Sequence, residues 1–235
     1  MVLRLVETLD VPLRARNEIL MAAGYAPIYP ERPIEAQEMR IAQHALERIL
    51  AHHEPFPAMV LDGTWNILMR NATSARVIAS CVDEAEMARL SADGKLNFMR
   101  MMFAPNGMRA HILSWEHTAP ALIARLRREA NAQPASPSEQ LLAELRATAV
   151  VPASAADFGE QPLEPVIPLE LGIGEVRLRL FNTITTFGTP QDITLQELRI
   201  EMSFPADDVT DQFLRQWAAV KGDTRPPFGS VSTAP

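Results

Sequence analysis

The spacing of apolar residues divides the chain into a largely helical part and a final third with strand periodicity. Apolar residues three and four positions apart predict amphipathic helices. The predicted helical segments are residues 1–24 in short pieces, 34–53, 72–81, 98–103, 108–131 and 140–147. Pro120 lies inside the fifth segment, where it should kink the helix or restart it after a cap at Thr118.

Alternation with a period of two predicts the strands. They are residues 58–61 and 65–68, joined as a hairpin at Asp62-Gly63, then 166–171, then 175–180 with its continuation over 181–187, and finally 198–204. In the last strand apolar residues alternate with Arg199, Glu201 and Ser203. Two strands, a run of helices and about three further antiparallel strands predict an α+β domain with one sheet face covered by helices. That order of elements is also the order of a PAS-type sensor domain.

Proline and glycine mark the expected domain boundaries. Residues 25–33 contain three prolines and form an extended linker after the helical pieces of residues 1–24. The α+β domain should then occupy residues 34–208, followed by a C-terminal helix and tail over residues 209–235, disordered from Gly222.

The charge balance changes what the chain is expected to bind. With 29 acidic residues against 22 lysines and arginines, the formal net charge is −7. A domain that grips the DNA backbone normally carries a basic excess, so these residues are a poor match for a polyanion. The single cysteine, Cys81, cannot close an intrachain disulfide. No segment has the form of a signal peptide or a transmembrane helix, so the expected location is the cytoplasm, with no membrane partner.

Catalytic and metal-binding patterns are weak throughout. Cys81 lies in an apolar helical stretch, where a thiol usually serves packing. His52-His53-Glu54 places neighbouring histidines about 100° apart on a helix, which disfavours a shared metal ion. We therefore expect no enzyme activity, no metal and no cofactor.

A methionine-rich stretch is the main candidate for ligand binding. Met99, Met101 and Met102 precede Phe103, and Met108, Ile112 and Trp115 follow within a few residues. Methionine is flexible and lines adaptable cavities, although the same residues could simply fill a core against the sheet. Arg100 and Arg109 lie among them. An inward-facing guanidinium would need an anionic partner, such as a ligand carboxylate, whereas an outward-facing one would need none.

Four segments also resemble a known family. Residues 9–27, from Leu-Asp-Val-Pro-Leu-Arg to Gly-Tyr-Ala-Pro, resemble the end of the helix-turn-helix domain in XRE-type bacterial regulators of the MmyB-like class. Residues 97–116, with Asn-Phe-Met-Arg-Met-Met-Phe, Gly-Met-Arg and Ser-Trp-Glu, resemble the ligand-binding domain of that class. So do residues 57–71 and 180–207, the latter including Phe-Asn-Thr-Ile-Thr-Thr-Phe-Gly-Thr-Pro-Gln-Asp-Ile-Thr-Leu-Gln-Glu-Leu-Arg-Ile-Glu.

The resemblance implies a PAS-like domain that binds a small apolar molecule, such as a fatty acid, in a dimeric transcription regulator. Residues 1–24 would then be the remnant of a helix-turn-helix domain that lies mostly outside this chain, and DNA would be bound only through that domain. The expected pocket wall is Trp65, Met101, Met102, Phe103, Ile112, Trp115 and Phe187, with Arg100 or Arg109 as the carboxylate partner. The alternative is a ligand-free dimerisation or interaction module without its own DNA-binding activity.

Overall fold

The computed structural model describes residues 2–92, 94–132, 137–147 and 168–220. Its helices are α1 (Val2–Thr8), α2 (Leu13–Ala22), η1 (Gln37–Met39), α3 (Arg40–His52), α4 (Ala72–Cys81), α5 (Glu84–Leu90), α6 (Phe98–Phe103), η2 (Met108–His111), α7 (Trp115–Ala132), α8 (Pro137–Ala147), α9 (Ile193–Glu197) and α10 (Asp208–Ala219). Its strands are β1 (Ala58–Leu61), β2 (Ile67–Arg70), β3 (Pro168–Ile173), β4 (Val176–Thr185) and β5 (Arg199–Pro205). The predicted tail from Gly222 lies outside the described residues.

The strands form one antiparallel sheet in the order β2-β1-β5-β4-β3. The last strand in the sequence therefore lies in the middle of the sheet, between the first strand and the fourth. Its register pairs Met59 with Glu201 on one side and Asn182 with Ser203 on the other. The predicted α+β, PAS-like class is confirmed by this sheet and the helices around it.

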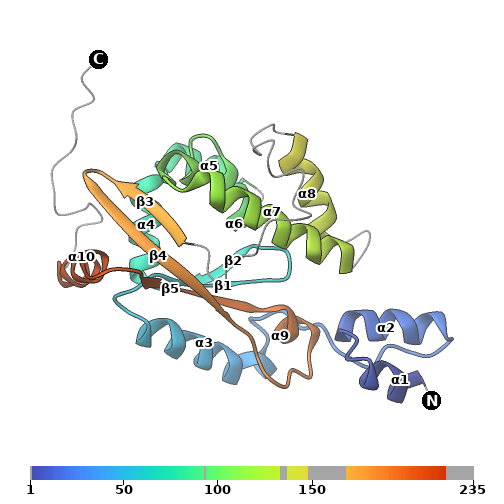
Figure 1. Ribbon diagram of the computed structural model, residues 1–235. Helices are drawn as coiled ribbons and strands as arrows, with labels where there is room; N and C mark the ends of the chain where they lie inside the picture. Colours follow the sequence, from blue (N-terminus) through green and yellow to red (C-terminus); the bar gives the residue numbers. More distant parts are fainter. Residues whose placement is uncertain (1, 93, 133–136, 148–167, 221–235) are drawn as a thin grey trace.

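Both faces of the sheet are covered, whereas the sequence predicted one covered face (Figure 1). Helix α3 packs on one face with Leu46 and Leu50 against Val60 and Ile200. Helices α4 to α8 lie on the other face, over the larger hydrophobic core. Helix α10 adds Phe213, Leu214 and Trp217 to that larger core.

Local polar contacts account for several differences from the predicted elements. The hairpin after β1 is confirmed, but its second strand begins at Ile67 because Asp62 accepts hydrogen bonds from the backbone N–H groups of Thr64 and Asn66. This widened turn places Trp65 at a φ of 70°. Pro120 lies inside α7, which begins at Trp115, so the helix neither starts at residue 108 nor restarts at Thr118.

The residue pattern did not predict two short helices, α5 and α9. Asp83 caps α5 by accepting from the Glu86 N–H, and Asp192 caps α9 by accepting from the Thr194 N–H. Helix α5 has two large apolar residues and α9 has five residues in all, so neither shows a clear apolar stripe. At α2 the N-cap is Pro12, and Gly24 follows the helix with a positive φ of 81°.

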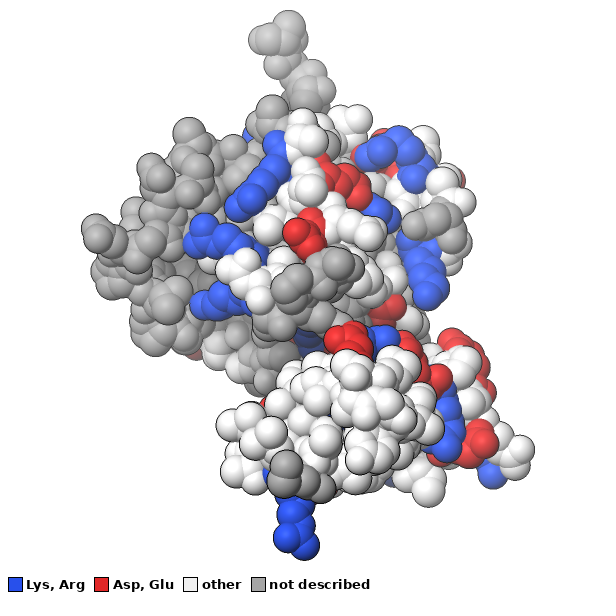
Figure 2. Space-filling view, turned by 90° about the vertical axis from the view of Figure 1, so that its right-hand side faces the viewer, with Lys and Arg blue, Asp and Glu red and all other residues white. Residues whose placement is uncertain are grey.

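Helices α1 and α2 form a small lobe beside the main domain (Figure 1). Most of this lobe's surface in Figure 2 is free of charged side chains. Its exposed large apolar residues are Leu3, Leu5, Leu9, Ile19 and Met21, with Tyr25 and Ile28 just after α2. In the part of the chain that the structure describes, no helix has both the length and the hydropathy to cross a bilayer.

Candidate functional site

The inner face of β5 is polar, although it faces the larger core. Arg199, Glu201 and Ser203 share the sheet face of Met59 and Leu61, because strand side chains alternate between faces. Their apolar neighbours Leu198 and Ile200 pack on the opposite face, under α3. Charged side chains within the core are costly unless paired, so their partners define the site.

A cavity of about 50 Å³ lies between this face and helices α4 and α6. Its wall is mostly apolar and includes four methionines, Met59, Met101, Met102 and Met108. The polar groups in its wall are Ser74, Asn182, Glu201 and Ser203. The cavity is well below the roughly 300 Å³ of a typical ligand pocket, but flexible methionines can be rearranged at low cost.

Helix α4 brings one of these polar groups, Ser74, into the core. Asn71 caps the helix by accepting from the Ser74 N–H at 2.9 Å, and the same oxygen accepts from the Ala58 N–H of β1 at 3.0 Å. This fixes the first turn of α4 against the sheet. Ser74 is 1% exposed, and its Oγ has no hydrogen-bond partner within the described residues.

A charged network around Trp65 holds Glu201 in the cavity wall. Arg125 of α7 donates from Nη1 to Glu201 Oε1 at 2.7 Å, and its guanidinium carbon lies 4.3 Å from the centre of the Trp65 ring. Trp65 is fully buried and donates from Nε1 to Glu129 at 2.8 Å. Arg199 lies 4.9 Å from the same ring and 3.0 Å from Glu129.

The two guanidinium groups and two carboxylates of this network balance one another at the edge of the core, where Glu201 is buried and the other three side chains are 17–24% exposed. Burial lowers the pKa of Arg199 from its usual value, while the nearby Glu129 carboxylate opposes that shift. The residue pattern did not predict this network. The alternation in β5 does place Arg199 and Glu201 on one face of the strand. Nothing in the pattern of α7 indicates that Arg125 and Glu129 face inward.

The structure brings most of the expected wall residues into one cluster. Met101 and Met102 line the cavity itself. Trp65, Phe103, Ile112 and Trp115 belong to the same hydrophobic core, with Phe103 and Trp115 in edge-to-face contact at 5.0 Å. Phe187 packs with the other cluster, on the α3 side of the sheet.

The two candidate arginines have different surroundings. Arg100 forms a bidentate ion pair with Glu144 of α8, and both side chains are more than a third exposed. Arg109 lies over Trp115, with its guanidinium carbon 5.3 Å from the ring centre. Arg109 Nε and Trp115 Nε1 are buried donors without an acceptor in the described part of the chain. Arg109 follows Met108, which lines the cavity.

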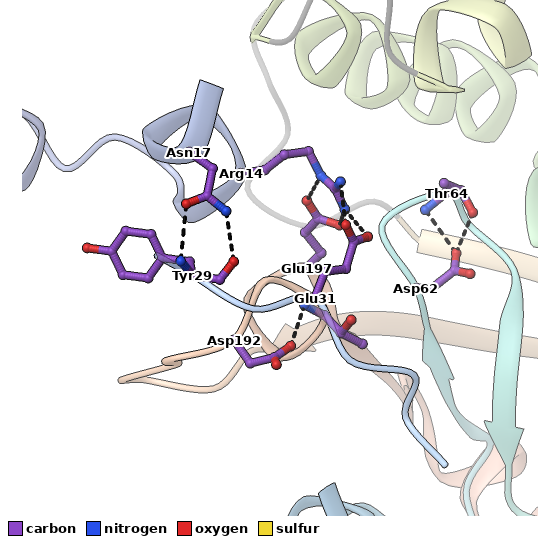
Figure 3. A network of polar contacts seen from close by, with 9 residues as sticks. Arg14, Asn17, Tyr29, Glu31, Asp62, Thr64, Asp192 and Glu197 are labelled. Carbon is purple, nitrogen blue, oxygen red and sulfur yellow. Dashed lines mark hydrogen bonds and ion pairs between the residues drawn. The ribbon is translucent and has the colours of Figure 1, made fainter. Parts of the chain in front are cut away.

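A second polar cluster joins the N-terminal lobe to α9, the short helix that precedes β5 (Figure 3). Arg14 of α2 donates to Glu197 at 2.7 Å and to Glu31 at 2.5 Å, and these bonds raise the pKa of Arg14. Gln196 accepts from the first N–H of α2, at Leu13. Because Glu197 ends α9 and β5 begins two residues later, this α2–α9 junction is continuous with the cavity wall.

The remaining candidate groups serve packing and backbone contacts. Cys81 is buried in the larger core, and burial raises the pKa of its thiol to about 12, which disfavours the reactive thiolate. His53 Nε2 lies 2.8 Å from the Ser203 carbonyl oxygen, and its ring meets Phe204 edge to face.

The comparison with known families covers most of this arrangement. A family model described as the MmyB-like transcription regulator ligand binding domain matches residues 42–216. The match begins in α3, ends in α10 and includes the whole sheet, the cavity and the Trp65 network. No curated protein matches the chain. Because the match spans well over half of the chain, the protein belongs to the family of MmyB-like transcription regulator ligand-binding domains.

Proposed function

We propose that the domain senses a small apolar molecule, and that a fatty acid is the ligand class that fits best. The observation that carries the proposal is the methionine-lined cavity together with two buried donors that have no acceptor among the described residues: Arg109 Nε, next in sequence to the cavity-lining Met108, and Trp115 Nε1, whose ring packs against Arg109. An acyl chain would replace the apolar contacts of the methionines. A carboxylate would supply the acceptor that both donors lack.

Binding an acyl chain requires the cavity to widen. The unbranched side chains of Met101, Met102 and Met108 can change rotamer without moving the backbone. Displacing Met108 would extend the cavity toward its neighbour Arg109. The carboxylate end would then lie between Arg109 and Trp115, with Phe103 beside the indole ring.

Occupancy would be passed to the N-terminal lobe through β5. The strand carries Glu201 and Ser203 in the cavity wall, and α9 before it holds α2 through Glu197 and Gln196. In a cytoplasmic homodimeric regulator, a shift of α2 would change how an attached helix-turn-helix domain meets DNA.

The proposal is tested by thermal unfolding with straight-chain acids of C12 to C18. Wild-type protein should be stabilised by at least one acid, in proportion to the acid concentration. Arg109→Ala should weaken that binding about tenfold or more, because it removes the charged partner of the carboxylate. Arg100→Ala, the matched control, should leave binding unchanged. Equal binding by both variants would remove Arg109 from the proposal, and no shift with any acid would contradict it.

A second candidate is an interaction module whose main role is self-association. The apolar surface of the α1–α2 lobe favours it, since large exposed apolar patches usually mark contact sites. This candidate predicts a dimer in sedimentation experiments whose stability does not change with any added acid. A ligand-dependent change in stability favours the sensor instead.

A further inference from the structure

The hydroxyl of Ser74 is buried, and neither the carboxylate nor the acyl chain of the proposed fatty acid would give it a hydrogen-bond partner. It faces the cavity from α4, on a residue that is 1% exposed, and has no partner among the described residues. The backbone N–H of Ser74 donates to the Asn71 cap, so the polar group that Ser74 can offer a ligand is its hydroxyl. Buried polar groups are normally hydrogen-bonded, and an unpaired one is costly.

The second polar feature of the cavity wall is the Glu201 carboxylate. Glu201 is 5% exposed and accepts one hydrogen bond from Arg125, through Oε1. Among the described residues that line the cavity there is no lysine, arginine or histidine. A carboxylate only accepts hydrogen bonds, whereas a serine hydroxyl both donates and accepts. The polar part of the wall therefore suits a neutral donor and disfavours a second anion.

Resting on the proposed function, we propose that the ligand carries a neutral hydroxyl group on its apolar chain, and that Ser74 and Glu201 recognise it. The ligand hydroxyl would donate to the Glu201 carboxylate and pair with Ser74 Oγ, while the carboxylate end stays with Arg109. The ligand class is thus a hydroxylated acyl chain. An unsubstituted chain would leave Ser74 unpaired beside it and should bind about tenfold more weakly.

A bound water is the competing occupant of this position. A cavity of about 50 Å³ has room for a water that bridges polar groups in its wall. If a water remains there when the ligand binds, Ser74 has no part in choosing between ligands. The two cases differ in how the Ser74→Ala variant ranks hydroxylated and unsubstituted acids.

The experiment is calorimetric titration of dodecanoic acid and of its singly hydroxylated derivatives, with the hydroxyl at each end and in the middle of the chain. Wild-type protein should bind at least one derivative about tenfold more tightly than dodecanoic acid. Ser74→Ala should lose that preference while binding dodecanoic acid at least as well as the wild type. Ser80→Ala, on the same helix but outside the cavity wall, should keep the preference.

Three outcomes would overturn the inference. If wild-type protein binds dodecanoic acid as tightly as every derivative, or if Ser74→Ala keeps the preference, Ser74 does not recognise a hydroxyl and the fatty-acid proposal stands alone. If no acid binds, hydroxylated or not, both the inference and the proposed function fail. Melting curves of the ligand-free Ser74→Ala protein give a folding control. That variant should be as stable as the wild type, because the deleted hydroxyl has no partner among the residues that the structure describes.

Discussion

The cavity and the α2–α9 junction are connected by one strand, β5, and they satisfy their polar groups in opposite ways. At the junction, Arg14, Glu31 and Glu197 bond to one another, and Asn17 bonds to the backbone of residues 28 and 29 (Figure 3). On the other side, Ser74 in the cavity wall and the contacting pair Arg109 and Trp115 after Met108 each keep a buried polar atom without a partner in the described residues.

The junction is thus a contact whose polar groups are paired within the protein, whereas the cavity side has polar groups that a ligand could pair. The junction is completed by the chain's own side chains, so it is expected to hold one geometry. The cavity side combines unpaired donors with flexible methionines, so its lowest free energy is expected only when a ligand supplies the missing contacts.

The largest expected effect comes from the ion pair between Arg125 and Glu201, whose buried carboxylate is part of the cavity wall. Arg125→Met leaves Glu201 without its partner in the core and should lower the free energy of unfolding by about 3–5 kcal/mol. The measurement is urea unfolding followed by Trp fluorescence and circular dichroism. Adding Glu201→Gln to Arg125→Met should restore much of the loss. An effect of Arg125→Met below 1 kcal/mol would show that the pair is solvated.

The next effect tests the junction. Arg14→Ala removes the bonds to Glu31 and Glu197, so hydrogen exchange in α1 and α2 should become about tenfold faster while the main sheet stays protected. Arg4→Ala, on the exposed side of α1, is the control and should change neither region. Equal exchange in wild type and Arg14→Ala would mean that apolar contacts alone hold the lobe.

Acid should open the same junction. The Arg14 guanidinium lowers the pKa of Glu31 below its usual value, so this ion pair stabilises the lobe at neutral pH and is lost as the pH falls through that lowered pKa. In the wild type, the protection of α1 and α2 amides relative to their intrinsic exchange rate at each pH should therefore fall once the pH drops below about 4.5, the usual pKa of a glutamate. The Glu31→Gln variant should lack this step, and a step that persists in it would point to another carboxylate.

The smallest expected effect on stability comes from adding one methylene group, and it is compared between the two faces of the sheet. Val77→Leu adds one methylene beside the cavity, so it should change the free energy of unfolding by less than about 1 kcal/mol and reduce binding of acyl chains. Val60→Ile adds one methylene to the close-packed α3 side and should cost about 1–3 kcal/mol. Similar costs at both positions would mean that the cavity side has no spare volume.

The sequence could predict the elements with long periodic patterns, but not which face of each element points into the core. The helix at residues 72–81 has the predicted bounds because its apolar residues recur three and four positions apart, and the short helix at 98–103 has the predicted bounds as well. The alternation in β5 was also clear, yet it could not show which face lies inward once helices cover both. That choice depends on Arg125 and Glu129 of α7, which lie 76 and 70 residues before their respective partners Glu201 and Arg199 in β5.

Prediction of the site was limited for the same reason, because burial of a side chain depends on contacts with distant parts of the chain. Met101 and Met102 could be identified because flexible apolar residues were concentrated there. Ser74 could not, since a serine in the first turn of a helix normally faces solvent or caps the helix. Its burial follows from Asn71, which ties the start of α4 to β1.

Native mass spectrometry of gently purified protein shows whether the cavity holds a ligand. We expect that part of the protein carries one acyl chain, that the bound mass is lost on delipidation, and that added C12 to C18 acid restores it together with the thermal shift. A spectrum of ligand-free protein alone, with no thermal shift from any of these acids, would contradict the assignment of the cavity as a ligand site.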